Sequence, residues 1–184
     1  MRCFISIELP ENIKSQIFHA FEKLKNSKLC QGNFTKKNNL HLTLKFFRNI
    51  SQEKLEQIKK TLKEIDFPQF PVETGKIGFF PNEKYIKILW IELIASDFEF
   101  LKKQIDEKLK KLNLNGDEKS FISHITLVRI NSIKDKKEFF KKIIKIAPKK
   151  KFFISNQFSL VKSILKRDGP EYKILENFQM RMRN

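Results

Sequence analysis

Two short segments of this 184-residue chain repeat one pattern, a histidine, any residue, a threonine and a leucine. They are His41-Leu42-Thr43-Leu44 and His124-Ile125-Thr126-Leu127. The chain has only 3 histidines, and two of them lie in this repeat. Chance would produce such a pair on the order of once in ten thousand sequences of this composition. We therefore interpret the repeat as a functional motif.

The residue types and spacing of both motifs suit chemistry on a phosphodiester. In a strand, side chains at i and i+2 share one face about 7 Å apart, so His41 lies beside Thr43 and His124 beside Thr126. Imidazole titrates near neutrality, so one histidine can accept a proton while the other donates one. Threonine hydroxyls can hydrogen-bond phosphate oxygens. If the two strands are neighbours, the pattern predicts two catalytic histidines and two substrate-binding threonines.

Two cations beside the motifs are further candidates for substrate binding. Strand alternation puts Lys45 on the face of His41 and Thr43, where it could reach the phosphate or the next nucleotide; a solvated lysine is the competing interpretation. Strict alternation from His124 sends Arg129 to the opposite face. Arg129 would reach the substrate only if a β-bulge turned it inward.

The sequence predicts neither a metal site nor a cofactor. Aspartate and glutamate occur singly along the expected helices, and two histidines on separate strands are too few for a zinc site. Cys3 and Cys30 cannot form a four-ligand zinc set alone. We expect both to be reduced thiols in a cytoplasm, without a disulfide.

A framework of alternating strands and helices must position the motifs. Side-chain alternation predicts strands over residues 2–9, 40–47, 72–80, 85–93, 121–130, 152–165 and 171–179. Helical spacing predicts helices over residues 11–25, 51–65, 97–112 and 136–146, with a break at 113–116. No linker or low-complexity stretch interrupts the chain, so we expect residues 1–184 to form a single α+β domain with two similar halves.

The charge of the chain narrows the choice of partner. Lys and Arg outnumber Asp and Glu by 38 to 21, a net charge of +17, as expected for a protein that binds phosphate-rich partners. A composition bias toward lysine across the genome is the competing interpretation. The N-terminus alternates unlike a signal peptide, and no 18 apolar residues run together. We expect a cytoplasmic monomer that makes no membrane contact.

Further motifs, taken together and in order, resemble one known family. They are residues 4–10, the block 39–46, Phe80-Pro81 with Trp90, the block 123–129, and Gly169-Pro170 with Tyr172. The set spans nearly the whole chain and resembles the 2H phosphoesterase superfamily. Within that superfamily it is most similar to the RNA 2′,3′-cyclic phosphodiesterases, also called 2′-5′ RNA ligases.

The resemblance implies both a fold and a reaction. The fold would be two-lobed with pseudo-twofold symmetry, with antiparallel sheets, helices on the outside and a central cleft. The reaction would be metal-independent hydrolysis of a 2′,3′-cyclic phosphate on RNA, such as a tRNA fragment, to a 2′-phosphomonoester, with reversible 2′-5′ joining. His41 would protonate the leaving 3′ oxygen and His124 would activate water. Arg129, Arg167 and Tyr172 match the family pattern near the cleft.

Ser123 departs from that pattern, because a proline often precedes the second motif in the family. A proline would hold the preceding backbone extended. We expect a looser start to this strand, without loss of a catalytic group.

Two other functions fit the same residues. The substrate could be a small cyclic nucleotide phosphate, or the chain could be a non-catalytic RNA-binding module. Phe79, Phe80 and Phe121 are candidates for stacking on bases, although most of the 19 phenylalanines are expected in the core. His19 is expected to be an ordinary surface residue of the first helix.

Overall fold

The computed structural model describes residues 1–112, 114, 121–167 and 169–183. Its strands are β1 (Arg2–Glu8), β2 (Cys30–Phe34), β3 (His41–Phe47), β4 (Phe70–Pro81), β5 (Ile86–Ile94), β6 (His124–Ile133), β7 (Phe152–Ser155), β8 (Gln157–Lys166) and β9 (Gly169–Gln179). Its helices are α1 (Glu11–Ser27), α2 (Gln52–Lys63), α3 (Asp97–Lys110), α4 (Lys136–Ile146) and the short 3₁₀ helix η1 (Lys37–Asn39).

Helices α1, α2 and α4 begin at residues that favour a helix start. Helix α1 follows Pro10, whose missing N–H costs nothing at a helix start. The Ser51 hydroxyl accepts a hydrogen bond from the Lys54 amide at the start of α2, and Asp135 caps α4 in the same way. Each α-helix turns an apolar stripe toward the sheet, so these helices cover its outer faces.

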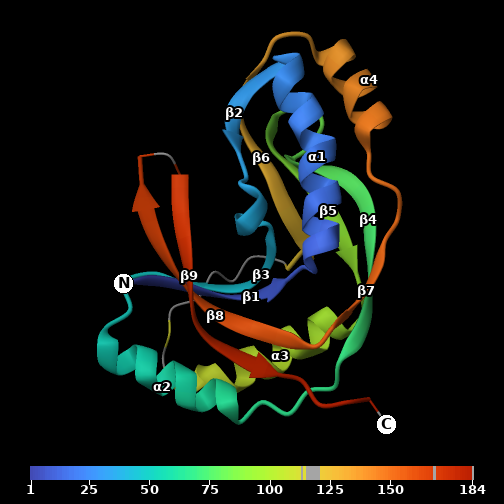
Figure 1. Ribbon diagram of the computed structural model, residues 1–184. Coiled ribbons are helices and arrows are strands. Elements are labelled where there is room, and N and C mark those ends of the chain that lie inside the picture. The colour runs from blue at the N-terminus through green and yellow to red at the C-terminus, as the bar shows by residue number, and fades with distance from the viewer. Residues whose placement is uncertain (113, 115–120, 168, 184) are drawn as a thin grey trace.

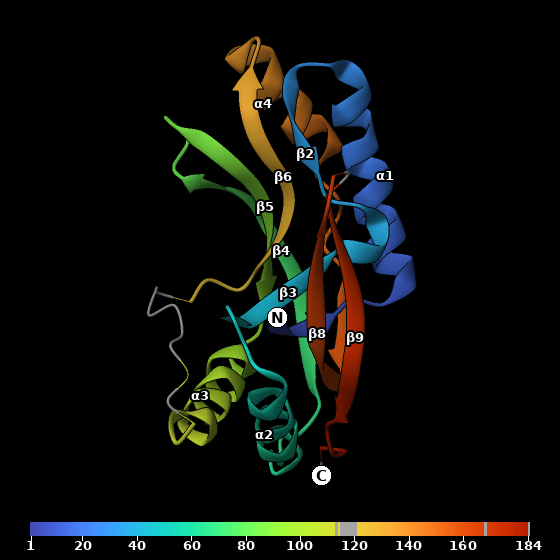
Figure 2. The same cartoon turned by 90° about the vertical axis from the view of Figure 1, so that its left-hand side faces the viewer.

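Within the described residues, nine strands form one curved sheet whose ladders are all antiparallel (Figure 1). The order is β7-β4-β5-β6-β3-β1-β8-β9. Strand β2 lies off this path and pairs with the C-terminal part of β6. The two halves of this sheet meet at a single residue pair, Leu42 on β3 and Ile125 on β6. Helices α1 and α4 pack together on one half, and α2 and α3 on the other (Figure 2). The predicted two-lobed α+β architecture is thereby confirmed.

Two elements differ from the sequence-based expectation. Strand β2 was not expected because its sequence, CQGNF, contains glycine and asparagine, which are poor strand formers. Backbone pairing with β6 creates it, and Gly32 is needed there because a Cβ would lie 2.2 Å from the Arg129 carbonyl oxygen. The strand expected over 152–165 is two strands, interrupted at Asn156, whose carbonyl accepts from the Met180 amide at 2.8 Å. The break expected at 113–116 lies outside the described residues apart from Leu114.

Most phenylalanines build the core. Phe47, Phe70, Phe98, Phe139 and Phe158 are almost completely buried. Two of the candidates for base stacking contact other side chains of the protein. The Phe79 ring packs on Phe140 with 5.3 Å between centroids, and Lys102 lies over the Phe121 ring. No helix in the described part of the chain is long and apolar enough to cross a membrane.

Candidate active site

The two motif strands lie side by side at the centre of the sheet. Leu42 faces Ile125 in an antiparallel pair, so the adjoining positions bring His41 across from Thr126 and Thr43 across from His124 on the other face. These four side chains line one cleft of about 650 Å³. The spatial convergence required by the sequence-based hypothesis is therefore present.

Backbone carbonyls orient both imidazoles. The Nδ1 atom of His41 lies 2.7 Å from the carbonyl oxygen of Asn39, and Nδ1 of His124 lies 2.7 Å from that of Ile122. Because a carbonyl oxygen only accepts hydrogen bonds, each Nδ1 carries a hydrogen and each Nε2 is free to exchange a proton. In His41 this Nε2 lies 2.9 Å from the Thr43 hydroxyl.

Aromatic rings pack around each histidine. Phe4 stacks on His41 with 4.7 Å between ring centroids, and Tyr172 meets it edge-on at 5.2 Å. Phe80 meets His124 edge-on at 5.0 Å, and Trp90 lies 5.8 Å away. Phe80 is thus held against a histidine and against Trp90. These rings limit the rotation of the imidazoles and remove water from one side of each.

Burial lowers the pKa of both histidines below the ordinary imidazole value, because the charged form loses hydration. For His41, the Asn39 carbonyl and the Glu8 carboxylate raise the pKa, whereas Lys14 and His124 lower it. For His124, the carbonyl of Ile122 raises the pKa and Arg129 lowers it. The carboxylate beside His41 favours a protonated ring and the cation beside His124 favours a neutral one, as an acid and a base respectively require.

Glu8 offers a direct test of this electrostatic asymmetry. It lies opposite His41 on β1, and its carboxylate is 2.7 Å from the Lys14 ammonium. Replacing Glu8 with glutamine removes the charge that raises the pKa of His41. If His41 is the acid, the alkaline limb of the pH profile of kcat/KM moves to lower pH. Glu53→Gln on α2 is the matched control and leaves the limb in place.

A second variant separates charge from structural damage. Glu8→Gln leaves Lys14 unpaired, and Lys14 also lowers the pKa of His41. The double variant Glu8→Gln, Lys14→Gln removes both opposing charges, so its limb returns toward the wild-type position. A limb that stays in place in both variants would show that these charges do not set the protonation of His41.

A β-bulge of the same kind follows each motif threonine. On β3, Thr43 pairs with Ser6 but Lys45 pairs with Ile5, so Leu44 is an extra residue. On β6, Thr126 pairs with Trp90 but Val128 pairs with Leu89, so Leu127 is extra. An extra residue reverses the alternation of side chains beyond it.

The bulge on β6 turns Arg129 into the cleft, which it lines together with both histidines. The bulge on β3 has the opposite consequence for Lys45, and the expectation that Lys45 shares the face of His41 and Thr43 is wrong. Its ammonium lies 2.6 Å from the Asp106 carboxylate on α3, and it does not line the cleft. Phe46 takes the cleft position instead.

Lys45 is therefore expected to contribute to stability and not to turnover. The ion pair with Asp106 is only partly exposed, so Lys45→Met should lower the free energy of unfolding by about 1 kcal/mol. Denaturant unfolding should show a similar loss in Asp106→Asn, and kcat/KM should stay unchanged in both variants. A tenfold fall in kcat/KM confined to the Lys45 variant would return Lys45 to the list of substrate ligands.

The start of β6 is fixed without the family's proline. The Ser123 hydroxyl donates to the Leu93 carbonyl oxygen at 2.6 Å, and the Leu93 amide donates to the Ser123 carbonyl at 2.9 Å. The looser start that we expected from Ser123 is thus not observed. His19, as expected, lies exposed on α1, 3.3 Å from Glu22.

The rest of the cleft comes from segments far away in the sequence. Arg167 and Tyr172, from the β8–β9 hairpin, line it as the family pattern suggested. Sequence reasoning missed the wall formed by β2 and the residues after it, which includes Asn33, Thr35 and Lys36. The Thr35 hydroxyl donates to the Thr126 carbonyl at 2.8 Å and ties this wall to the second motif. No signal in the CQGNF segment pointed to this role.

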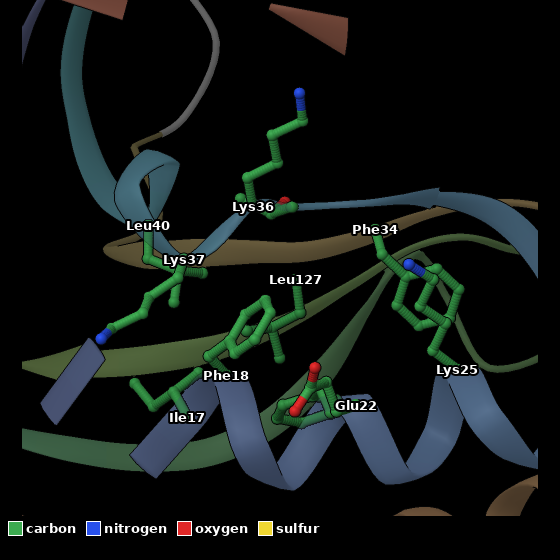
Figure 3. A pocket seen from close by; sticks show the side chains of 11 residues that line it. Ile17, Phe18, Glu22, Lys25, Phe34, Lys36, Lys37, Leu40 and Leu127 are labelled. Atoms are coloured by element: carbon green, nitrogen blue, oxygen red, sulfur yellow. The ribbon is translucent and has the colours of Figure 1, made fainter. Parts of the chain in front are cut away.

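A smaller cavity of about 170 Å³ lies behind this wall, between α1 and η1 (Figure 3). Its inner surface is apolar, with Ile17, Phe18 and Leu127 among the lining residues. It shares Phe34 and Lys36 with the cleft. The motif histidines do not line it.

A curved two-lobed sheet with two histidine-threonine strands at its centre defines a class of phosphoesterase, and comparison with known proteins agrees. The family model for LigT-like phosphoesterases matches residues 7–90. The RNA 2′,3′-cyclic phosphodiesterase of Methanocaldococcus jannaschii is 33% identical over 181 residues, covering 97% of this chain and 100% of that protein. The protein of the same name from Archaeoglobus fulgidus is 30% identical, covering 97% and 100%. The chain belongs to the LigT-like family of 2H phosphoesterases.

Solved structures show the same fold. A protein from Thermus thermophilus superposes with a TM-score of 0.83 at 24% identity, covering 100% of both chains. Escherichia coli LigT, crystallised with 3′-AMP, gives a TM-score of 0.79 at 23% identity, covering 97% of both chains. At this level of identity the likeness establishes the fold alone.

Proposed function

We propose that this protein hydrolyses the 2′,3′-cyclic phosphate at the 3′ end of RNA to a 2′-phosphomonoester. The observation that carries the proposal is the single cleft that His41, Thr43, His124 and Thr126 line together, with each histidine across from the threonine of the other motif. The names of the archaeal relatives support the substrate class. RNA, a tRNA fragment for example, is the proposed partner, and a cytoplasmic monomer remains the expected state.

The reaction needs one proton taken and one proton given. His124 accepts a proton from water as the water oxygen bonds to phosphorus. The bond from phosphorus to the 3′ oxygen breaks, and His41 gives its proton to that oxygen. The product keeps the phosphate on the 2′ oxygen and has a free 3′ hydroxyl. Each step needs an imidazole Nε2 that faces the cleft, and the carbonyl bonds to Nδ1 provide that orientation.

Charge on the non-bridging phosphate oxygens grows in the transition state. The two threonine hydroxyls donate hydrogen bonds to these oxygens, and Arg129 and Arg167 line the same cleft as cations that offset the charge. Aromatic rings behind the histidines lower the local dielectric and so strengthen these interactions.

The proposed mechanism uses no metal ion. Acid, base and charge stabilisation are each supplied by a side chain of the cleft. Among the residues that the structure describes, no three of His, Cys, Asp or Glu are grouped as metal ligands. The same groups could also join two RNA ends, since attack by a 5′ hydroxyl in place of water, with the 3′ oxygen again as the leaving group, would give a 2′-5′ linkage and a free 3′ hydroxyl.

An assay of chelator-treated protein tests the proposal. The substrate is an RNA oligonucleotide with a 2′,3′-cyclic phosphate end, and ³¹P NMR of the product shows which hydroxyl keeps the phosphate. We expect full turnover with excess EDTA and a product that is entirely the 2′-phosphate. A 3′-phosphate product would overturn the roles of the two histidines, and activity restored only by added metal would overturn the mechanism.

A further inference from the structure

We infer that a basic groove beside the cleft binds the RNA backbone on the 5′ side of the cyclic end, so that the protein favours RNA chains over mononucleotides. This inference rests on the proposed function. The groove, which we call the exit groove, has a volume of about 520 Å³ and adjoins the cleft. It is lined by Lys36, Lys37, Asn38, Asn39, Lys166, Gly169, Pro170, Glu171 and Tyr172.

The exit groove and the cleft are continuous. Six residues line both, and Asn39 and Tyr172, which contact the His41 ring, are among them. The Asn39 side-chain amide donates to the Pro170 carbonyl at 2.8 Å and ties η1 to the β8–β9 hairpin. The floor of the groove is therefore fixed to the loop that orients the first histidine.

The chemistry of the substrate requires such an exit. A 2′,3′-cyclic phosphate is a 3′ terminus, so the rest of the RNA extends only from the 5′ side of the terminal nucleotide. Ligand sites typically measure about 300–1,000 Å³, and the cleft of about 650 Å³ falls in that range for a terminal nucleotide. The next phosphates must leave the cleft through an open side, and a positively charged surface there would bind them.

The cleft and the exit groove have a higher ratio of cations to carboxylates than the composition of the whole chain would give. Five cations line the cleft and Lys37 of the exit groove makes six, whereas Glu171 is the single carboxylate residue among the described lining residues. The whole chain has 38 basic and 21 acidic residues. A composition bias alone would place about three carboxylates beside six cations. The low number of carboxylates among these described residues thus favours an anionic ligand with several phosphates.

The lysines of the exit groove can exchange their present partners for phosphate. Lys37 pairs with Glu11 and Lys166 pairs with Glu171, and both pairs are at the surface, where ion pairs are weak. Lys36 forms no ion pair with any residue that the structure describes. In Figure 3 its side chain extends away from the apolar side chains of the small cavity, represented by Phe18 and Leu127. That cavity, in contrast, offers an apolar interior and suits no phosphate.

Two substitutions of opposite sign test the inference. Lys37 and Glu171 line the exit groove but not the cleft. Lys37→Gln removes a cation, so kcat/KM for a cyclic-phosphate tetranucleotide should fall roughly threefold to tenfold. Glu171→Gln releases Lys166 for phosphate binding and should raise the same kcat/KM by a few fold. For the mononucleoside 2′,3′-cyclic phosphate with the same base, kcat/KM should stay unchanged in Lys37→Gln. In Glu171→Gln it should rise less than for the tetranucleotide, because Lys166 also lines the cleft.

A salt series and a matched control complete the experiment. Lys60→Gln removes the same charge from the exposed face of α2, away from the groove, and should leave both substrates unaffected. The dependence of log kcat/KM on log salt should be steep for the tetranucleotide alone, and Lys37→Gln should reduce its slope by about 0.7.

The outcomes separate the two proposals. The wild-type protein could hydrolyse both substrates equally while neither groove variant changes the tetranucleotide rate. That result would refute RNA binding by the exit groove and leave the proposed function intact. Equal loss on the mononucleotide and the tetranucleotide would also refute RNA binding by the exit groove. If the wild-type protein hydrolyses neither substrate, both the proposed function and the proposed role of the exit groove are wrong.

Discussion

Replacing either motif histidine with alanine is expected to lower kcat by ~10²–10⁴-fold while RNA binding changes little. His41 and His124 both line the cleft with Nδ1 held by a carbonyl, so each presents Nε2 as the proton-exchanging atom. The hydroxyls and cations that hold the phosphate remain in both variants. Single-turnover rates and fluorescence anisotropy of a labelled RNA measure the two quantities separately.

The double variant shows whether the histidines act together. If one gives and the other takes a proton in the same step, His41→Ala with His124→Ala should be little slower than the slower single variant. His19→Ala on the exposed face of α1 is the control and keeps full activity. Turnover within threefold of wild type in either single variant would show that this histidine is neither the acid nor the base, and absence of turnover in the wild type would favour a non-catalytic RNA-binding role.

The threonine hydroxyls are expected to have the next largest effect. Thr43→Val and Thr126→Val keep the shape and the strand-forming tendency of the side chain but remove the donor to the phosphate. Losing one preorganised donor should lower kcat/KM roughly 10²-fold. Both hydroxyls lie in the cleft across from the histidines. Steady-state kinetics with the cyclic-phosphate RNA measures the effect.

Serine at the same positions separates the hydroxyl from the methyl group. Thr43→Ser and Thr126→Ser retain a donor and should stay within about tenfold of wild type. In the free protein the Thr43 hydroxyl contacts Nε2 of His41 at 2.9 Å, so Thr43→Val also loses a contact that positions the ring. If the valine variants are as active as the serine variants, the threonines serve the strands and not the phosphate.

The sequence was sufficient to predict the parts of the site that depend on local periodicity. The repeat identified His41, Thr43, His124 and Thr126, and alternation within each tetrapeptide correctly put each histidine beside its threonine. The resemblance to known phosphoesterases added the two-lobed fold with its central cleft and pointed to Tyr172. These features follow from residues that are near each other in the sequence or in a recognisable motif.

The remaining parts of the site depend on tertiary structure. Leu44 and Leu127 are ordinary strand residues, so nothing in their type predicts a bulge, yet the bulges decide that Arg129 reaches the cleft and Lys45 does not. Glu8 reaches His41 only because β1 and β3 are paired. Strand β2 forms through pairing with β6 and against its own weak propensity.

The pH dependence of kcat/KM in the wild type and the two histidine variants tests most directly whether both rings act on one phosphate. A base must be neutral, so the rate falls as pH drops through the pKa of His124. An acid must be protonated, so the rate falls as pH rises through the pKa of His41. Because burial lowers the pKa of both rings, we expect a bell whose limbs lie below the ordinary imidazole range.

Each variant should lose one side of that bell. His124→Ala should lose the acidic limb and keep the alkaline one, and His41→Ala should lose the alkaline limb and keep the acidic one. A bell that keeps both limbs in either variant would contradict the assignment of the two histidines as acid and base.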